Sequence, residues 1–373
     1  MKTHKLLYAI LSFGLVALFV RPQAAFAITV PDGCDYLIIT DSLLLPQAQR
    51  LATMRANLSQ SAVKKPTLVT MADIYAAYPI SSTKYKSLLF FLKDLYKTPE
   101  KWPKYLVLFG DASENETSNH NHVPTFVYRA KQNLSDTIPV SADDVYTCLK
   151  DSLNDTEFTP KIIVGRIPAH TLMQATHYVD KVIQYETKFA YGPKAFTYGF
   201  LADDDKQLIF PEPIQGLVNQ HEVLWNRLKI KPFVRRTLEV EFQFDDGFHK
   251  NKARDSLISM WNSGLSDFYY VGHGHFNQLT DEAAFQIPRD LNLLSSNNQN
   301  PIVSLLACTT SPFVIDSIES IGESLLFNPY GAIAVLGAVE ETYPTPNLDL
   351  FSEWIDSLGV TKTIGEGFQQ ARI

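Results

Sequence analysis

Two reactive side chains stand at the ends of apolar runs in the second half of the chain. Residues 268–272 (Phe-Tyr-Tyr-Val-Gly) lead into His273, and residues 302–307 (Ile-Val-Ser-Leu-Leu-Ala) lead into Cys308. Such runs are typical of strands buried on both faces of a parallel sheet, where ligand chemistry gathers at the carboxyl ends of the strands. An imidazole and a thiol at one rim are what a cysteine nucleophile needs, because the thiolate is the attacking species.

Both residues also have simpler interpretations. A cysteine after an apolar run is, without further context, more often part of a core than a nucleophile. His273 and His275 form a His-x-His pair that zinc could use, but no further histidine or carboxylate cluster at ligand spacing follows them. We therefore assign no metal ligands. The choice between core cysteine and nucleophile depends on the partner histidine and on the rest of the sequence.

Short apolar runs predict the strands that would position these residues. They are residues 36–40, 67–70, 105–110, 161–165, 197–202, 268–272, 301–307 and 331–337. Helical patterns lie between them, for example at residues 44–58, 87–96, 172–185, 253–261 and 320–327. Strands that alternate with helices of this length predict an α/β fold of βαβ units, with mostly parallel sheets flanked by helices.

The alternating series starts twice, at residue 36 and again at residue 197. A Gly-Pro pair at residues 192–193 marks the best seam between the two series. We expect an N-terminal α/β subdomain over residues 28–190 and a C-terminal subdomain over residues 191–373. A length of 373 residues agrees with about two domains. One long sheet with two halves fits the pattern equally well.

The net charge of the chain bears on which partners it can bind, and its N-terminal segment bears on the cellular compartment. The chain has 33 Lys and Arg against 40 Asp and Glu, a net charge of -7, which argues against nucleic acid as the main partner. A basic start, an apolar run at residues 6–20 and a small-x-small site ending at Ala27 predict a signal peptide over residues 1–27. We expect export to the periplasm, the cell envelope or the medium. An uncleaved anchor is the weaker alternative, since the run is shorter than the ~20 residues of a membrane span, and no later segment approaches one.

The three cysteines leave at least one thiol unpaired within the chain. In an oxidising compartment Cys34 and Cys148 can form a disulfide, or they can remain two separate buried residues. Cys308 is the thiol expected to stay free, because its neighbours set it apart.

The wider sequence resembles the caspase-like (clan CD) cysteine peptidases and, among them, the gingipain family, peptidase family C25. The motifs that carry the resemblance are residues 36–40, 72–75, 105–111, 143–146, 165–168, 181–186, 271–274, 307–308, 321–323 and 331–337. The resemblance implies an exported endopeptidase with a caspase-like three-layer fold of two α/β subdomains. The second subdomain would hold the active site, with His273 and Cys308 as the catalytic dyad and no cofactor required.

The implied reaction begins when the Cys308 sulfur attacks a peptide carbonyl and forms a thioester acyl-enzyme. His273 would protonate the leaving amine and then activate the water that hydrolyses the thioester. The backbone N–H groups of Gly274 and Cys308 are the expected oxyanion donors. A glycine directly after the histidine would let the backbone approach the substrate closely, where a side chain would hinder it.

One departure from the family pattern leaves the function open to a second interpretation. Family members often carry an acidic residue in the strand before Gly-Arg, proposed to orient the histidine, but Lys161 stands at about that place here. The alternative to a peptidase is therefore a catalytically silent C25-like domain that binds peptides or envelope partners. A processing peptidase or transpeptidase acting on other exported proteins is a variant of the first interpretation. Protein or peptide substrates are the expected partners, and the sequence indicates no oligomeric state.

Short stretches of sequence suggest which substrate residue is preferred at P1 and where a metal ion could bind. The loop at residues 338–344 should border the pocket for the P1 residue, where Glu340 or Glu341 would pair with a basic side chain and Tyr343 would pack on its alkyl stem. The alternative is that both glutamates are solvated. Asp203, Asp204 and Asp205 could bind a structural calcium ion, although a solvated turn is the favoured interpretation. His120 and His122, in a polar loop, are expected at the surface.

Overall fold

The computed structural model describes eleven segments of the chain. They are residues 28–59, 61–80, 83–131, 137–147, 161–188, 197–203, 209–228, 231–236, 252–295, 299–357 and 360–372. The predicted signal peptide, Cys148, Asp204 and Asp205 lie outside them. Signal cleavage, a disulfide to Cys148 and calcium at the aspartate triplet therefore remain predictions. No described helix combines the length and the apolar character that crossing a bilayer requires.

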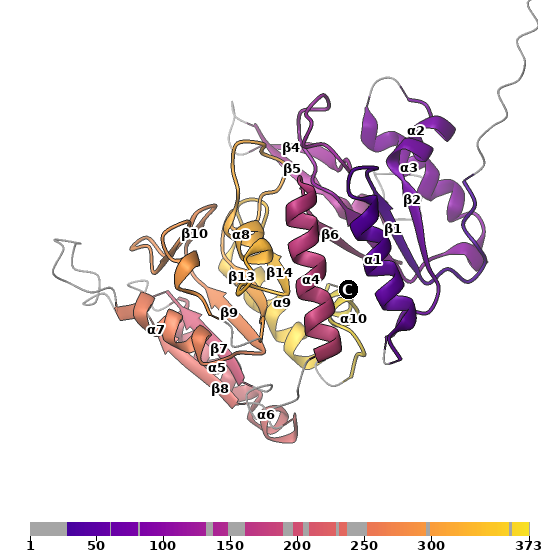
Figure 1. Cartoon of the computed structure of the whole chain (residues 1–373). Coiled ribbons are helices and arrows are strands. Elements are labelled where there is room, and N and C mark those ends of the chain that lie inside the picture. Colours follow the sequence, from indigo (N-terminus) through magenta and orange to yellow (C-terminus); the bar gives the residue numbers. More distant parts are fainter. Residues whose placement is uncertain are drawn as a thin grey trace, which may run out of the picture.

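The first sheet has four parallel strands in the order β2-β1-β3-β6. These are β1 (Tyr36–Thr40), β2 (Pro66–Thr70), β3 (Tyr105–Phe109) and β6 (Ile163–Ile167). Helices α1 (Leu45–Asn57) and α4 (Leu172–Lys188) pack on one face, and α2 (Met71–Ala77) and α3 (Lys84–Leu95) on the other (Figure 1). Every residue of β1 is buried, which explains why its sequence is apolar rather than alternating.

The second sheet has five parallel strands in the order β14-β13-β9-β7-β8. These are β7 (Thr197–Ala202), β8 (Lys231–Arg236), β9 (Asp267–Val271), β13 (Ile302–Leu306) and β14 (Ala334–Gly337). One face is covered by α5 (Pro211–Gln220), α6 (Glu222–Leu228) and α9 (Pro344–Ser357), the other by α7 (Lys252–Asn262) and α8 (Ile321–Phe327). The predicted α/β class with mostly parallel, helix-flanked sheets is confirmed.

Short elements decorate both sheets. A hairpin of β4 (Phe126–Lys131) and β5 (Thr137–Ala142) follows the first three strands, and a three-stranded ribbon of β10 (Gly274–His275), β11 (Gln278–Leu279) and β12 (Phe285–Gln286) follows β9. The sequence pattern did not predict these pieces, which are too short or too polar to stand out. The last predicted strand begins late, at Ala334, because the Gly331 and Ala332 N–H groups donate to Asn328 and Leu325 in a turn that closes α8.

Helix α4 joins the two sheets through a shared core. Its residues Ala175, Val179 and Val182 are buried at helical spacing, in one cluster with Phe327 of α8 and Ile333 before β14. Helix α10 (Ile364–Ala371), the last element, returns to the first half and packs against β6. The proposed division at residues 190/191 therefore remains a prediction, since elements from both sides of it pack together.

Lys181 of α4 ties the two halves with polar contacts. Its ammonium group, in a side chain that is almost fully buried, donates hydrogen bonds to the backbone carbonyls of Leu326 and Asn328 at the end of α8. A cation at this end of a helix also interacts favourably with the helix dipole. Lys181 thus gives the Leu326 carbonyl a donor from another helix and adds a second donor to the Asn328 carbonyl, which also accepts from the Gly331 N–H.

Burial lowers the pKa of Lys181 from its ordinary value of 10.5 to about 7. The folded chain therefore binds fewer protons than the unfolded chain between those values, and the stabilisation by Lys181 increases as the pH rises through that range. Relative to Lys181→Met, the natural chain should gain about 1 kcal/mol of unfolding free energy per pH unit between pH 7 and about pH 9, measured by urea unfolding. Lys362→Met, at an exposed lysine, should show no such gain. A difference that is constant with pH would contradict this assignment.

Candidate active site

The pairing of β9 with β13 brings the predicted dyad to one rim of the second sheet. The two strands are parallel neighbours, and their last paired residues are Val271 and Leu306. His273 and Cys308 each follow that pair by two residues, so the strands deliver both to the same carboxyl edge. His273 is exposed and Cys308 is partly buried. The catalytic roles of the two residues remain a proposal, developed below.

The backbone of His273 is held at both of its polar groups. Its N–H donates to the Asp203 carboxylate at 3.0 Å, and its carbonyl accepts from the Tyr270 hydroxyl and from the Thr280 N–H. The Phe210 ring meets the imidazole edge-on, with ring centroids 5.3 Å apart. Fixed backbone and ring contacts of this kind restrict where the imidazole can point.

Two glycines allow this close packing. A Cβ atom on Gly272 would lie 2.4 Å from both the Asp203 Cβ and the Tyr270 hydroxyl. A Cβ atom on Gly274 would lie 2.7 Å from the Ala307 Cβ and 2.9 Å from the Cys308 carbonyl oxygen. The role of Gly274 in letting substrate approach stays a prediction. The structure adds a second reason for glycine here, because the turn that carries Cys308 fills the space that a Cβ atom would occupy.

Cys308 begins a strained turn that is fastened to the loop after β14. Thr309 has φ 47°, a left-handed conformation that is costly for a β-branched residue. Its N–H donates to the Glu340 carbonyl at 3.1 Å. The Cys308 sulfur lies 3.4 Å from both the backbone N and the backbone O of Thr342. Among the described residues, the Cys308 N–H has no acceptor, so it is available to an oxyanion.

The predicted specificity loop therefore lies beside the thiol. Glu340 is partly buried, Glu341 is exposed, and Tyr343 keeps 75% of its surface exposed. Burial raises the pKa of the Glu340 carboxyl, and the neighbouring charge of Glu341 adds to that effect. A carboxylate in this position is stabilised by a cationic partner.

Two cavities differ in their relation to this site. One of ≈ 470 Å³ opens beside the β10–β11 ribbon, next to the dyad, and is lined by Gly274, His275, Asn277, Gln278, Thr280 and Asp281. A larger one of ≈ 650 Å³ lies at the opposite edge of the sheets, where Tyr36, Tyr105 and Asp267 begin their strands. Size alone would select the wrong cavity, because the reactive side chains stand at the other strand ends.

Several expectations about polar residues are corrected. Asp203 is 3% exposed and accepts the His273 N–H, so its assignment to a solvated turn is wrong. The His122 side chain is only 11% exposed, and its Nε2 lies 3.1 Å from the His170 carbonyl, so it is not a surface histidine. Lys161 is exposed and no described contact joins it to His273.

Three contributors to the rim were missed in the sequence. Asp203 ends an apolar run, the same signal that identified His273, but its partner becomes evident only when β7 lies next to β9. In the sequence, Tyr270 looks like one more core residue of an apolar run, because only its hydroxyl group reaches the rim of the sheet. Thr342 acts through its backbone, which any residue would offer.

Comparisons with known proteins agree with this geometry. The model of peptidase family C25 matches residues 29–373. Among solved structures, the arginine-specific cysteine proteinase gingipain R is similar at 16% identity, with a TM-score of 0.65 over 92% of this chain and 73% of that one. The complex of the pro- and mature domains of RgpB from Porphyromonas gingivalis matches at 16% identity and TM-score 0.63, over 91% of this chain and 72% of that one. A structure described only as a protease matches at 14% identity and TM-score 0.61, over 93% and 77%. These likenesses confirm the caspase-like fold. A search of curated proteins found no match.

Gly274→Ala should displace the turn that carries Cys308, because the new methyl group would meet Ala307, Cys308 and Thr310 at less than 3.0 Å. A shift of this kind costs about 100-fold in kcat/KM for peptide hydrolysis, and overpacking costs about 1–3 kcal/mol of stability. Gly216→Ala in α5 is the matched control, since nothing lies within 4 Å of its new carbon. It should leave hydrolysis unchanged. Equal hydrolysis by the natural chain and Gly274→Ala would show that this contact does not position the thiol.

Proposed function

Because the chain belongs to peptidase family C25, a family of cysteine peptidases, we propose that it is an exported endopeptidase that uses Cys308 as nucleophile and His273 as acid and base. The observation that supports this most directly is the register of β9 and β13, which sets the two residues at the same offset beyond one rim. The apolar run and small-x-small site at the N-terminus support export.

Acylation starts from a thiol held by the Thr342 backbone. In the neutral form the S–H donates to the Thr342 carbonyl, and the Thr342 N–H donates to the sulfur. When the proton leaves for the His273 imidazole, the N–H contact remains and favours the thiolate. The sulfur then attacks the scissile carbonyl carbon, the C–N bond breaks, and the imidazolium returns its proton to the leaving amine.

The Cys308 N–H is the donor best suited to the developing oxyanion. It belongs to the nucleophile itself and has no acceptor among the described residues. The fixed turn at Thr309 preorganises this N–H, so little reorganisation is needed during the reaction. In the second half of the reaction, His273 takes a proton from water while the water oxygen attacks the thioester carbonyl carbon. The C–S bond then breaks, the product leaves as a carboxylic acid, and the thiolate and imidazolium of the dyad are restored.

A basic residue at P1 is the specificity that the loop after β14 supports. Glu340 lies beside the thiol and is partly buried, with the charge of Glu341 next to it. An arginine or lysine side chain would pair with one of these carboxylates and reduce the repulsion between the two, and the exposed Tyr343 ring would pack on its alkyl stem. Gingipain R, which is described as arginine-specific, has the same fold.

Lys161 is the observation that favours the alternative of a catalytically silent peptide- or envelope-binding domain. It stands where the family often carries an acid, and no described contact joins it to His273. The Asp203 carboxylate, which fixes the histidine backbone, provides a different means of orienting His273. Chemical labelling of the thiol separates the two functions.

A peptidyl chloromethyl ketone should label the natural chain once, under reducing conditions. Cys308→Ala should abolish labelling, and His273→Ala should slow it by at least about 100-fold, because the imidazole supports ionisation of the thiol. Cys34→Ala is the matched control. Cys34 is 2% exposed and burial raises the pKa of its thiol, so its loss should change nothing. No labelling of the natural chain at any pH from about 6 to 9 would favour the silent domain.

Substrates that differ only at P1 test the role of the glutamates. Arginine and lysine substrates should exceed leucine and asparagine substrates in kcat/KM, and Glu340→Gln with Glu341→Gln should reduce that preference by about 10–100-fold, the worth of a hydrogen bond to a charged group. The preference should also fall as the medium is acidified, already above the ordinary glutamate pKa of 4.5, because the pKa of Glu340 is raised. Equal turnover of all four substrates would contradict a basic P1 preference and leave the peptidase assignment intact.

A further inference from the structure

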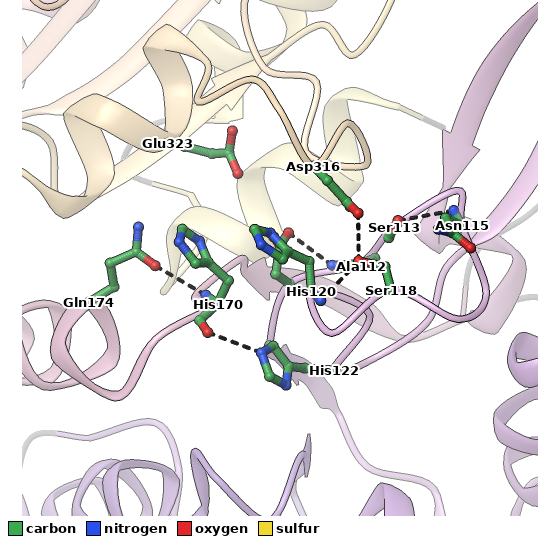
Figure 2. Close-up of polar contacts among 12 residues, drawn as sticks. Ala112, Ser113, Asn115, Ser118, His120, His122, His170, Gln174, Asp316 and Glu323 are labelled. Carbon is green, nitrogen blue, oxygen red and sulfur yellow. Dashed lines mark hydrogen bonds and ion pairs between the residues drawn. The ribbon is translucent and has the colours of Figure 1, made fainter.

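Three metal-ligating side chains converge at the carboxyl edge of the first sheet. Asp111 follows β3 and His170 follows β6, and these two strands are paired to their last residues, Phe109 and Ile167. His120 comes from the loop that follows Asp111, and Figure 2 shows its ring beside that of His170. Their ligand atoms all lie within 4.8 Å of one another. The cluster is separate from the dyad, which stands on the second sheet.

The geometry of the cluster is close to that of a metal site without its ion. The His120 Nδ1 lies 3.8 Å from the Asp111 Oδ2, and the His120 and His170 rings stack at 4.7 Å with an angle of 12° between their planes. Ligands at 2.0–2.2 Å around a tetrahedral zinc ion are separated by about 3.3 Å. Small side-chain movements would therefore close the cluster on an ion.

Hydrogen bonds hold the backbones of both histidines. The His170 N–H donates to the Gln174 side chain at 3.1 Å, and its carbonyl faces the His122 Nε2 at 3.1 Å. The His120 N–H donates to the Ser118 hydroxyl at 3.0 Å, and its carbonyl accepts from the His122 N–H. Because these contacts use backbone atoms, the imidazole nitrogens stay available as ligands.

Asp111 has one oxygen engaged and one directed at the histidines. Its Oδ1 accepts the Ala112 N–H at 2.8 Å, while its Oδ2 faces His120. The residue is 5% exposed. Arg166 already contributes one positive charge near this buried carboxyl, and a divalent cation would add positive charge directly at its second oxygen.

We propose that Asp111, His120 and His170 bind one divalent transition-metal ion of the zinc class. Two imidazoles and one carboxylate are ligands that zinc accepts, whereas calcium and magnesium prefer an all-oxygen set. Three protein ligands leave a fourth position for water. Figure 2 shows Glu323 of α8 on the far side of the cluster from His122, and its carboxylate accepts hydrogen bonds from the N–H and the hydroxyl of Ser320.

The site lies where the first sheet meets the segment that leads from Cys308 to α8. Ser118, next to His120 in the loop, donates to the Asp316 carboxylate, and the Glu114 N–H donates to the Val314 carbonyl. A bound ion would fix this loop and, through these contacts, residues 314–316. We therefore expect the metal to stabilise the junction between the two halves rather than to take part in peptide cleavage.

Metal titration of the mature chain tests the site directly. The chain is stripped with a chelator and carries Cys308→Ala, so that the catalytic thiol cannot take the metal. Calorimetric titration with zinc chloride should give one equivalent bound, and cobalt(II) should give the strong visible absorption of a four-coordinate ion without a thiolate band. His120→Ala and His170→Ala should each weaken zinc binding by at least about 100-fold.

Two histidine controls make the outcome specific. His177→Ala removes an exposed histidine of α4, and His275→Ala removes the second member of the His-x-His pair at the dyad; neither should alter binding. If His170→Ala does not fold, as judged by circular dichroism, His120→Ala and the cobalt spectrum of the parent chain decide the question. The proposal is overturned if the parent binds neither metal, if His120→Ala binds zinc as tightly as the parent, or if His275→Ala abolishes binding.

Discussion

The parallel pairing of β9 with β13 is the constraint on which the candidate active site depends. Both strands are buried, so packing on their two faces fixes the register, and the dyad takes the same offset from both strand ends. A slip of one residue would shift one side chain by about 3.3 Å along the strand and turn it to the other face. The backbone must turn immediately beyond the strands, which explains the crowded Gly272 and Gly274 and the left-handed Thr309.

The rim is assembled from four strands that are consecutive in the sheet, β14, β13, β9 and β7. The proposed nucleophile, Cys308, comes from the second and His273 from the third, while the outer two supply partners: the Thr342 backbone for the sulfur and the Asp203 carboxylate for the histidine N–H. Each of these residues therefore has a backbone or carboxylate partner from a neighbouring strand, and His273 is also held by the Tyr270 hydroxyl of its own strand.

Much of the fold could be predicted because buried parallel strands leave near-continuous apolar runs; β1 and β7 were predicted to the residue. The polar hairpins and α10 could not. Gly365 and Gly367 give α10 a weak propensity, and it is stabilised by a capping box from Thr363 and by packing on β6. In the site, sequence pattern identified side chains that end strands. It missed contacts that depend on which strands become neighbours, such as Asp203 with His273, because that pairing is not encoded locally.

Helix α10 is a part of the first half's packing that is synthesised long after the strand it covers. It packs against β6, with Lys104 near the start of β3 paired to its Glu366 and with Gly365 against Ile163. About 200 residues separate β6 from this partner, which at 5–20 residues per second is roughly 10–40 s of synthesis. Until α10 is synthesised, the part of β6 that it covers lacks this partner, so the contacts between α10 and the first sheet can form only at the end of synthesis.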